Sequence, residues 1–180
     1  MHGDFTIRKL VSTDAQAWRT IRLRGLKEHP TAFGMDYAAV AHLAPEDFWP
    51  KIPPANARDA IFGSFDNDVL VGVAGLAVEP GVKRQHKAKL WGVFVDQSVR
   101  NRGAARSLLH AVLTYAKDHV ELVQLSVSTD NPAARALYLS LGFIPFGLAR
   151  NALKYEGKYV DEELMALALA RGCVNQTHAR

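Results

Sequence analysis

The apolar residues of this chain alternate in some stretches and recur at longer spacings in others. Alternation at residues 5–10 predicts an edge strand. Residues 60–78 predict two strands joined at Asp66-Asn67. The second of these, residues 69–78, is apolar on both faces, which favours a central place in a covered sheet. The remaining strands are expected at residues 88–95 and 122–128 and in a final pair around Gly157.

Helices are expected where the apolar spacing lengthens. Asp14 is placed to cap a first helix that runs to about Glu28, where His29-Pro30 ends it. Pro45 opens a short second helix that continues through Trp49. A third helix carries one apolar face at spacings of three and four residues. The residues of that face are Ala105, Leu108, Leu109, Val112, Leu113 and Ala116.

A fourth helix completes the pattern, with Asn131 as its N-cap, Pro132 in its first turn and Gly142 at its end. The element order is therefore strand, two helices, three strands, helix, strand, helix and two strands. This order predicts an α/β domain with a mixed sheet covered by helices. We expect one domain over residues 1–170 and a flexible tail at residues 171–180.

Composition narrows the classes of protein that this chain can represent. Its 180 residues suffice for one domain with a sizeable core. The net charge of +4 comes without a lysine run or an aromatic-interleaved basic stripe, so we expect no nucleic-acid partner. Neither a bilayer-spanning apolar stretch nor a signal-peptide core is seen, which predicts a cytoplasmic protein without membrane contact. One cysteine, Cys173, and histidines without metal-ligand spacing argue against a disulfide or a metal site.

Positive charge gathers at the start of the third helix, around Arg100, Arg102 and Arg106. A helix start exposes unpaired N–H groups, and Gly103 lets the backbone approach a ligand closely. The loop therefore suits an anion, phosphate above all. An ordinary glycine turn with solvated arginines explains the same residues equally well. The loop has neither the Gly-Lys-Ser/Thr of a Walker loop nor the dinucleotide GxGxxG pattern.

A second segment makes the interpretation of this loop more specific. Arg100-x-x-Gly103-x-Ala105 matches the Q/R-x-x-G-x-G/A motif of the GNAT superfamily, the histone-acetyltransferase-like N-acetyltransferases. The stretch at residues 131–143, which includes Tyr138, resembles the motif that follows it in that family. The resemblance covers roughly residues 5–170. It implies a GNAT-like mixed, mostly antiparallel sheet of about seven strands flanked by about four helices.

The resemblance also implies acetyl-CoA as the acetyl donor. The loop would cradle its pyrophosphate, and the strand before the loop would pair with the pantetheine arm. A backbone N–H of Phe94 or Val95 would polarise the thioester carbonyl. Asn131 would contact the cofactor or serve only as a cap. The cofactor-binding residues implied in this way are Val93, Phe94, Val95, Arg100, Asn101, Arg102, Gly103, Ala104, Ala105, Arg106, Asn131 and Tyr138.

By the same resemblance, the amine would attack the thioester directly, without an acyl-enzyme. Tyr138 would protonate the departing thiolate, unless it is a core aromatic. Several family members carry a glutamate as base on the strand that corresponds to residues 87–95, and this chain has none there. Glu79 and His86 are the remaining candidates for the base. Glu79 is better explained as a solvated turn residue, and His86 can equally be an ordinary part of a basic loop.

The acceptor is expected between the first two helices and the final strand pair. The acidic run Asp161–Glu163 there suits a cationic acceptor or simply a solvated hairpin. We expect a small-molecule primary amine; a protein N-terminal or lysine amine is the alternative, and a non-catalytic acetyl-CoA-binding module is a third. A homodimer is left open. The residues that could shape the acceptor pocket, or merely pack, are Phe33, Met35, Tyr37, Trp91, Tyr155 and Tyr159.

Overall fold

The computed structural model describes residues 5–48 and 51–169, and it consists of one seven-stranded sheet with helices on both faces. The strand order is β1-β2-β3-β4-β5-β7-β6. Every neighbouring pair is antiparallel except β4 and β5, which are parallel. The mixed, mostly antiparallel fold predicted from the sequence is thereby confirmed. The strands are β1 (Thr6–Lys9), β2 (Ala60–Asp66), β3 (Val69–Val78), β4 (Lys87–Val95), β5 (Leu122–Ser128), β6 (Ile144–Tyr155) and β7 (Lys158–Ala168).

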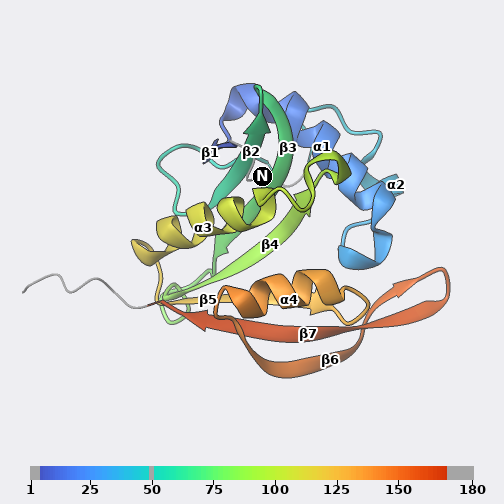
Figure 1. Cartoon of the computed structure of the whole chain (residues 1–180), viewed down its shortest axis with the longest axis vertical. Helices are drawn as coiled ribbons and strands as arrows, with labels where there is room; N and C mark the ends of the chain where they lie inside the picture. The colour runs from blue at the N-terminus through green and yellow to red at the C-terminus, as the bar shows by residue number, and fades with distance from the viewer. Residues whose placement is uncertain (1–4, 49–50, 170–180) are drawn as a thin grey trace, which may run out of the picture.

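Helices α3 and α4 lie on one face of the sheet, and α1 and α2 lie on the other (Figure 1). The first face holds the larger core cluster, in which Leu108, Val112 and Ala116 of α3 are fully enclosed. The second core forms around Trp18, Phe48 and Phe94. No helix of the described residues is long and apolar enough to cross a membrane. The helices are α1 (Ala15–Glu28), α2 (Tyr37–Val40), α3 (Ala104–Lys117) and α4 (Pro132–Ser140).

Two expectations about the N-terminal helices need correction. The second helix begins at Tyr37 rather than Pro45, because Asp36 accepts a hydrogen bond from the Ala38 amide and caps it. Pro45 starts only a turn, and Trp49 lies outside the described residues. Asp14 stands at the N-cap of α1, but its carboxylate accepts from Val11 N and pairs with Arg8 instead of capping the helix.

The feature that positions the site is the separation of β4 from β5. Their parallel pairing covers only Lys87–Lys89 opposite Leu122–Gln124, after which the strands diverge, as Figure 1 shows. On its other side, β4 stays paired to β3 up to Val95, with a bulge opposite Ala74. Gly92 lies in that bulge with a φ of 64°, a conformation that favours glycine. The edge of β4 that faces β5 is therefore left without a strand partner over most of its length.

Close packing fixes the side chains of β4 on the α1 side. A Cβ on Gly25 of α1 would lie 3.1 Å from the Phe94 ring, so the helix approaches the strand at a residue without a side chain. A Cβ on Gly75 of β3 would overlap the Trp91 ring. Large rings on β4 thus fit against glycines on the neighbouring elements, which leaves them little freedom to move.

We predict that Gly75→Ala destabilises the protein by about 1–3 kcal/mol, because the new methyl group displaces the Trp91 ring in a packed core. The matched control is Gly34→Ala, where the nearest atom to a new Cβ, in Leu153, is 3.8 Å away. That variant should be neutral or slightly stabilising. Urea unfolding of both variants checks the difference, and equal midpoints would contradict the packing at Trp91.

Candidate active site

A groove of about 570 Å³ opens between β4 and β5 where the two strands separate. Residues of β4 from Leu90 to Val95 form one wall, and residues of β5 from Leu125 to Ser128 form the other. The start of α3 closes one end, and the inner face of α4 flanks the groove nearby. The two motifs that were separate in the sequence therefore meet around one cavity.

The α3 end of the groove presents backbone N–H groups. Asn101 and Gly103 have φ values of 61° and 89°, so the loop turns twice through left-handed conformations before α3 begins. Among the described residues, no acceptor takes the amides from Gly103 to Arg106. These amides and the positive end of the helix dipole form a concave site for an anion.

The three arginines of this loop have different hydrogen-bond partners, and only two of them line the groove. Arg100 and Arg106 line the groove. Arg100 donates to Val95 O at 3.2 Å and to Nε2 of His29 at 2.9 Å, and Arg106 donates to Ser140 Oγ at 2.8 Å. Arg102 is not among the lining residues.

Asp66 accounts for the different position of Arg102. The guanidinium of Arg102 donates to Asp66 Oδ2 at 2.9 Å and lies 5.1 Å from the ring centroid of Phe5. Of the cofactor-binding residues expected from the sequence, Arg102 alone is held outside the groove, and the others line it.

The groove-facing edge of β4 ends at Val95. Asp96 N donates to Val71 O across the β3 side, and backbone groups of a strand alternate in direction from one residue to the next. The N–H and C=O of Val95 therefore face the groove, and those of Phe94 face β3. Of the two residues left open in the sequence analysis, only Val95 therefore turns its N–H toward the groove. The Phe94 side chain is itself buried in the core on the α1 side.

Tyr138 lies on α4 with its ring in the core, 5.8 Å from the ring of Phe143, and it also lines the groove. The residue is 7% exposed. Burial raises the pKa of Tyr138 well above the ordinary tyrosine value. The hydroxyl therefore remains protonated at neutral pH, as a proton donor must.

Asn131 has the capping role expected of it. Its Oδ1 accepts from the Ala134 amide at 3.1 Å, which satisfies one free N–H at the start of α4. The residue also lines the groove. Contact with the cofactor remains a prediction, and the cap is confirmed.

The structure does not bring Glu79 or His86 to the groove. Glu79 follows β3, where its carboxylate lies 3.7 Å from Arg84. His86 lies just before β4 at the closed end of the β4–β5 pair, and its carbonyl accepts from the Glu121 and Leu122 amides. Both are outside the lining residues of the groove, which include no carboxylate. Neither is placed for proton transfer at a thioester held there.

A second pocket, of about 500 Å³, lies between the end of α1, the following loop and β6. Phe33 lines both this pocket and the groove, so the two are neighbours. Trp91 belongs to the groove. Tyr159 lines neither; it is exposed, with Lys154 Nζ 5.0 Å from its ring centroid. The other residues expected to shape an acceptor pocket and found in this one are Met35, Tyr37 and Tyr155.

The acidic run of β7 is largely engaged within the protein. Asp161 Oδ1 accepts from the Asn151 amide at 2.7 Å, and Glu163 accepts from Arg135 at 2.8 Å. The charge of Glu163 is balanced by Arg135, whereas Asp161 has a neutral backbone amide as its partner and keeps its negative charge. Within the described ranges, no group of three or more His, Cys, Asp or Glu side chains is arranged to hold a metal ion.

Two residues near the groove were not identified from the sequence. His29 lines the groove and accepts from Arg100. Arg22 is buried beneath it, on the apolar face of α1. A signal for Arg22 was present, since its position follows Trp18 by four residues and precedes Gly25 by three, on the side of the helix that faces the core.

Comparison with known proteins shows the family to which this chain belongs. A sequence model described as the acetyltransferase (GNAT) family matches residues 29–143, more than half of the chain. The chain is 34% identical to the N-alpha-acetyltransferase RimI of Mycobacterium tuberculosis over 116 residues, which is 62% of this chain and 72% of RimI. It is 32% identical to the L-amino acid N-acetyltransferase AaaT of Escherichia coli over 103 residues, which is 56% of this chain and 62% of AaaT.

The fold also matches solved structures. One is YncA of Salmonella typhimurium, whose structure was solved with its cofactor acetyl-CoA. It superposes with a TM-score of 0.75 at 19% identity, and the match covers 97% of this chain and 99% of YncA. At that identity the likeness concerns the fold.

The raised pKa of Tyr138 leads to a prediction about alkaline stability. Above about pH 10, the unfolded chain loses the Tyr138 proton while the folded protein keeps it, so stability falls as pH rises. In Tyr138→Phe, the free energy of unfolding should fall less steeply with pH, by up to about 1.4 kcal/mol per pH unit. Urea unfolding between about pH 9 and about pH 11 measures the slopes. Tyr159→Phe, at an exposed position, should keep the wild-type slope; an unchanged slope in Tyr138→Phe would contradict burial of its hydroxyl.

Proposed function

Because this chain belongs to the acetyltransferase (GNAT) family and is an N-acetyltransferase, we propose that it transfers an acetyl group from acetyl-CoA directly to the primary amine of a small molecule. The observation that carries the proposal is the groove between β4 and β5, with unpaired α3 amides at one end and the Tyr138 hydroxyl along it. A phosphate-bearing thioester fits both features at once.

In this proposal the pyrophosphate is held by the amides from Gly103 to Arg106, and the side chains of Arg100 and Arg106 add charge. The pantetheine arm lies along the unpaired edge of β4 and pairs with its backbone, as an added strand would. Arg102 is left out of the cofactor site because Asp66 holds its guanidinium. Asn131 contacts the cofactor from the start of α4.

The thioester carbonyl is proposed to accept a hydrogen bond from Val95 N, because this amide faces the groove. When the amine attacks the carbonyl carbon, negative charge develops on that oxygen, and a fixed N–H in a shielded groove stabilises it. Phe94 contributes differently, since its backbone pairs with β3 and its ring packs against Gly25 of α1.

Collapse of the tetrahedral intermediate breaks the carbon–sulfur bond and leaves a thiolate. Tyr138 is proposed to give this sulfur its phenolic proton, because it is a protonated donor in the groove. The nitrogen has meanwhile become a cation and must lose one proton, which restores the phenol through solvent. The amine's proton thus ends on the CoA thiol, and the protein returns to its starting state.

No carboxylate lines the groove to deprotonate the amine, and His29 is not free to do so. A guanidinium can only donate, so Nε2 of His29 uses its lone pair to accept from Arg100. We therefore propose that the acceptor reacts as its neutral form. At pH 7 about a tenth of the N-terminal α-amine of a peptide is neutral, against fewer than about one in a thousand of a lysine side chain. Among protein amines, this difference favours an N-terminal α-amine over a lysine side chain.

A protein N-terminal amine is the second candidate, and similarity to RimI, named as an N-alpha-acetyltransferase, favours it. Similarity to AaaT, named as an L-amino acid N-acetyltransferase, favours a small molecule. Thiol release measured with short peptides and with free small amines at equal concentrations separates the two.

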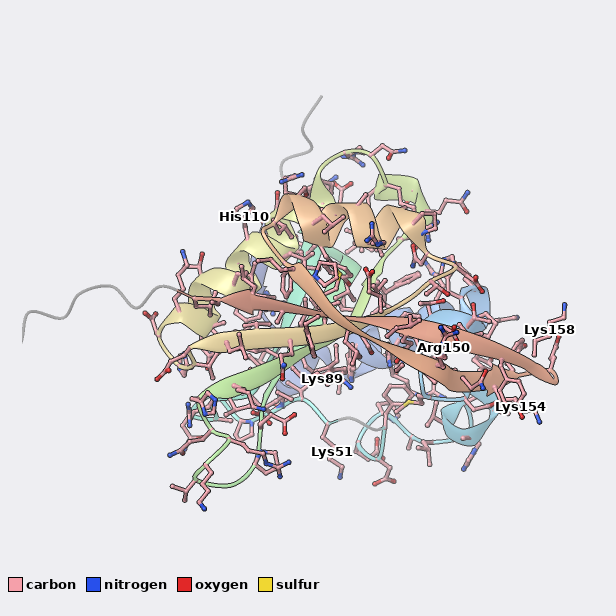
Figure 2. All side chains as sticks on the ribbon, turned by 90° about the horizontal axis from the view of Figure 1, so that it is seen from below. Lys51, Lys89, His110, Arg150, Lys154 and Lys158 are labelled. Carbon is pink, nitrogen blue, oxygen red and sulfur yellow. The ribbon has the colours of Figure 1, made fainter. Side chains whose placement is uncertain are left out.

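We predict that acetyl-CoA raises the melting temperature. Ligand at 100 times its Kd adds about 2.7 kcal/mol of stability, and dephospho-CoA or truncated forms should add less. Gly103→Glu should abolish the shift, because its carboxylate would occupy the anion site. His110→Glu, which adds the same charge at an exposed position two turns along α3 (Figure 2), should leave the shift intact. A normal shift in folded Gly103→Glu would contradict the cofactor placement.

We also predict that Tyr138→Phe lowers the rate of acetyl transfer by about 10²–10⁴, the usual contribution of a positioned proton donor. Acetyl-CoA binding should change little, because the ring and its packing are kept. The loss should fall on kcat more than on KM, since the hydroxyl acts only as the thiolate forms. Single-turnover measurement of the transfer step avoids masking by product release. A wild-type rate for that step would make Tyr138 a packing residue.

A further inference from the structure

His29 is the residue at which α1 ends, and it lines the groove. Its backbone N–H donates to Gly25 O at 2.9 Å, and Pro30 after it disfavours a further helical residue. The His29 ring lies 6.1 Å from the ring of Phe94, which belongs to the core on the α1 side of β4. The end of a helix and a packed core therefore fix the place of this imidazole.

Arg100 joins the His29 ring to the end of β4. Its Nη2 donates to Nε2 of His29 at 2.9 Å, and its Nε donates to Val95 O at 3.2 Å. Because a guanidinium has donors only, Nε2 of His29 accepts with its lone pair, and the ring is uncharged in this contact. Two of the five N–H groups of Arg100 are used in these bonds, and the others remain for a ligand in the groove.

The partners of Arg100 differ in charge from the partner of Arg102. Arg102 donates to the Asp66 carboxylate at 2.9 Å, so an anion balances its charge, and it does not line the groove. The Glu28 carboxylate lies 4.0 Å from Nη2 of Arg100, beyond hydrogen-bond distance, and the two side chains are 41% and 40% exposed. Water screens a contact of this kind, so most of the Arg100 charge stays available to an anion.

An ion pair already attaches α1 to the loop before α3. Arg24 of α1 pairs with Asp96, which directly follows β4. Asp96 Oδ1 also accepts from Ser98 N at 2.9 Å. Hydrogen bonds from Ser98 and the charge of Arg24 hold the pKa of Asp96 below the ordinary aspartate value, so this carboxylate stays charged at neutral pH. The bond between His29 and Arg100 is therefore not needed to hold the helix against the loop.

We propose that His29 positions Arg100 for the phosphates of acetyl-CoA, by fixing the direction of the guanidinium without neutralising its charge. This proposal rests on the proposed function, because it concerns how the same groove holds that cofactor. An arginine that is already held loses less rotamer freedom when a ligand binds than one that moves freely. A carboxylate in place of the imidazole would hold Arg100 equally well, but it would compete with the phosphates for the charge. His29 is therefore a positioning residue rather than a catalytic one.

The place of Arg100 in the groove agrees with this role. Its guanidinium is bonded to the carbonyl of Val95, the residue whose N–H faces the groove. Arg100 also lines the same groove as the unpaired amides from Gly103 to Arg106. A phosphate in this groove would meet neutral amide donors together with a charged donor, and charge-assisted hydrogen bonds are the stronger kind.

The decisive comparison is between His29→Gln and His29→Glu, whose new side chains have the same length and differ in charge. The amide offers Arg100 a neutral acceptor, so the Kd of acetyl-CoA should stay near the wild-type value. The carboxylate balances the charge of Arg100 and repels phosphate, so the Kd should rise by about 10- to 100-fold, the loss expected when a charge-assisted hydrogen bond is forfeited. Isothermal titration calorimetry measures both.

His29→Phe keeps a ring at this position and removes the acceptor. Its Kd for acetyl-CoA should rise by about 2- to 10-fold, the cost of ordering one long side chain when the ligand binds. Recovery of wild-type affinity in His29→Gln would show that the acceptor, rather than the ring, is what Arg100 requires.

Thr31→Glu is the matched control for the added charge. Thr31 lies two residues after His29 and lines neither pocket. A carboxylate at this position adds the same charge near the end of α1 but outside the groove, where solvent and salt screen it. The Kd of acetyl-CoA should therefore change much less than in His29→Glu.

Removal of the guanidinium tests whether His29 acts through Arg100. Arg100→Met should itself raise the Kd of acetyl-CoA by about 10- to 100-fold. In that background, His29→Gln and His29→Phe should bind acetyl-CoA equally well, because the acceptor has no guanidinium left to hold. A purely structural role of His29 would lower affinity by the same factor in both backgrounds.

The proposal is overturned if folded His29→Glu binds acetyl-CoA as tightly as His29→Gln does, or if Thr31→Glu weakens binding as much as His29→Glu. It is also overturned if His29→Phe weakens binding equally with and without the Arg100 side chain, because the ring would then act on the ligand or the groove directly.

Failure of the proposed function looks different. If acetyl-CoA binds but no amine releases thiol, the transfer reaction is wrong, and the comparison of Kd values still decides the role of His29. If acetyl-CoA does not bind to wild type, melting shifts with inorganic pyrophosphate decide it. A shift in wild type and His29→Gln that is lost in His29→Glu supports the role, and equal shifts or no shift refute it.

Discussion

The loss of pairing between β4 and β5 after three residue pairs is the constraint on which the site depends. A paired strand edge has no free hydrogen-bonding groups, and a fully paired sheet has no groove. Because β4 keeps β3 on its other side, it remains a rigid strand while exposing one edge. The N-terminus of α3 and the inner face of α4 then lie at the same opening. The sheet is thus both the scaffold and one surface of the site.

The α1 side of β4 supports that edge by fitting large groups against small ones. Gly25 admits the Phe94 ring, Gly75 admits the Trp91 ring, and Gly92 leaves space for the Arg22 guanidinium. Two of these contacts, Gly25 with Phe94 and Gly92 with Arg22, join residues far apart in sequence. Together they hold β4 from the side opposite to α3 and α4, so the exposed backbone at Val95 has a fixed position. A fixed donor is more effective than a mobile one, because it need not reorganise as charge develops.

The parts of this protein that could be predicted from sequence are those determined by local pattern. Apolar periodicity and cap residues were enough to predict the strands, α3 and α4. The shape of the loop before α3 depends on Asn101 and Gly103, which lie within it. The sequence-based predictions that failed concern residues whose contacts are with residues distant in the chain. Nothing near Arg102 indicates that Asp66, 36 residues earlier, holds it away from the groove. Glu79 and His86 are near β4 in sequence, but they lie at its closed end. Arg22 could not be recognised as unpaired until the surrounding elements were in place.

The hydrogen bond from Arg106 to Ser140 connects the two helices beside the groove, α3 and α4. Both side chains are exposed, so the bond is weak and exchanges readily with water. At the other end, the β4–β5 ladder and the core beneath it join the same two halves far more strongly. Small opening fluctuations of the molecule should therefore pivot about the closed end of the sheet, with their largest amplitude at the mouth. A ligand phosphate that binds Arg106 would replace the bond between Arg106 and Ser140 with a bond to the ligand. The time for which the ligand stays bound would then depend on this opening motion.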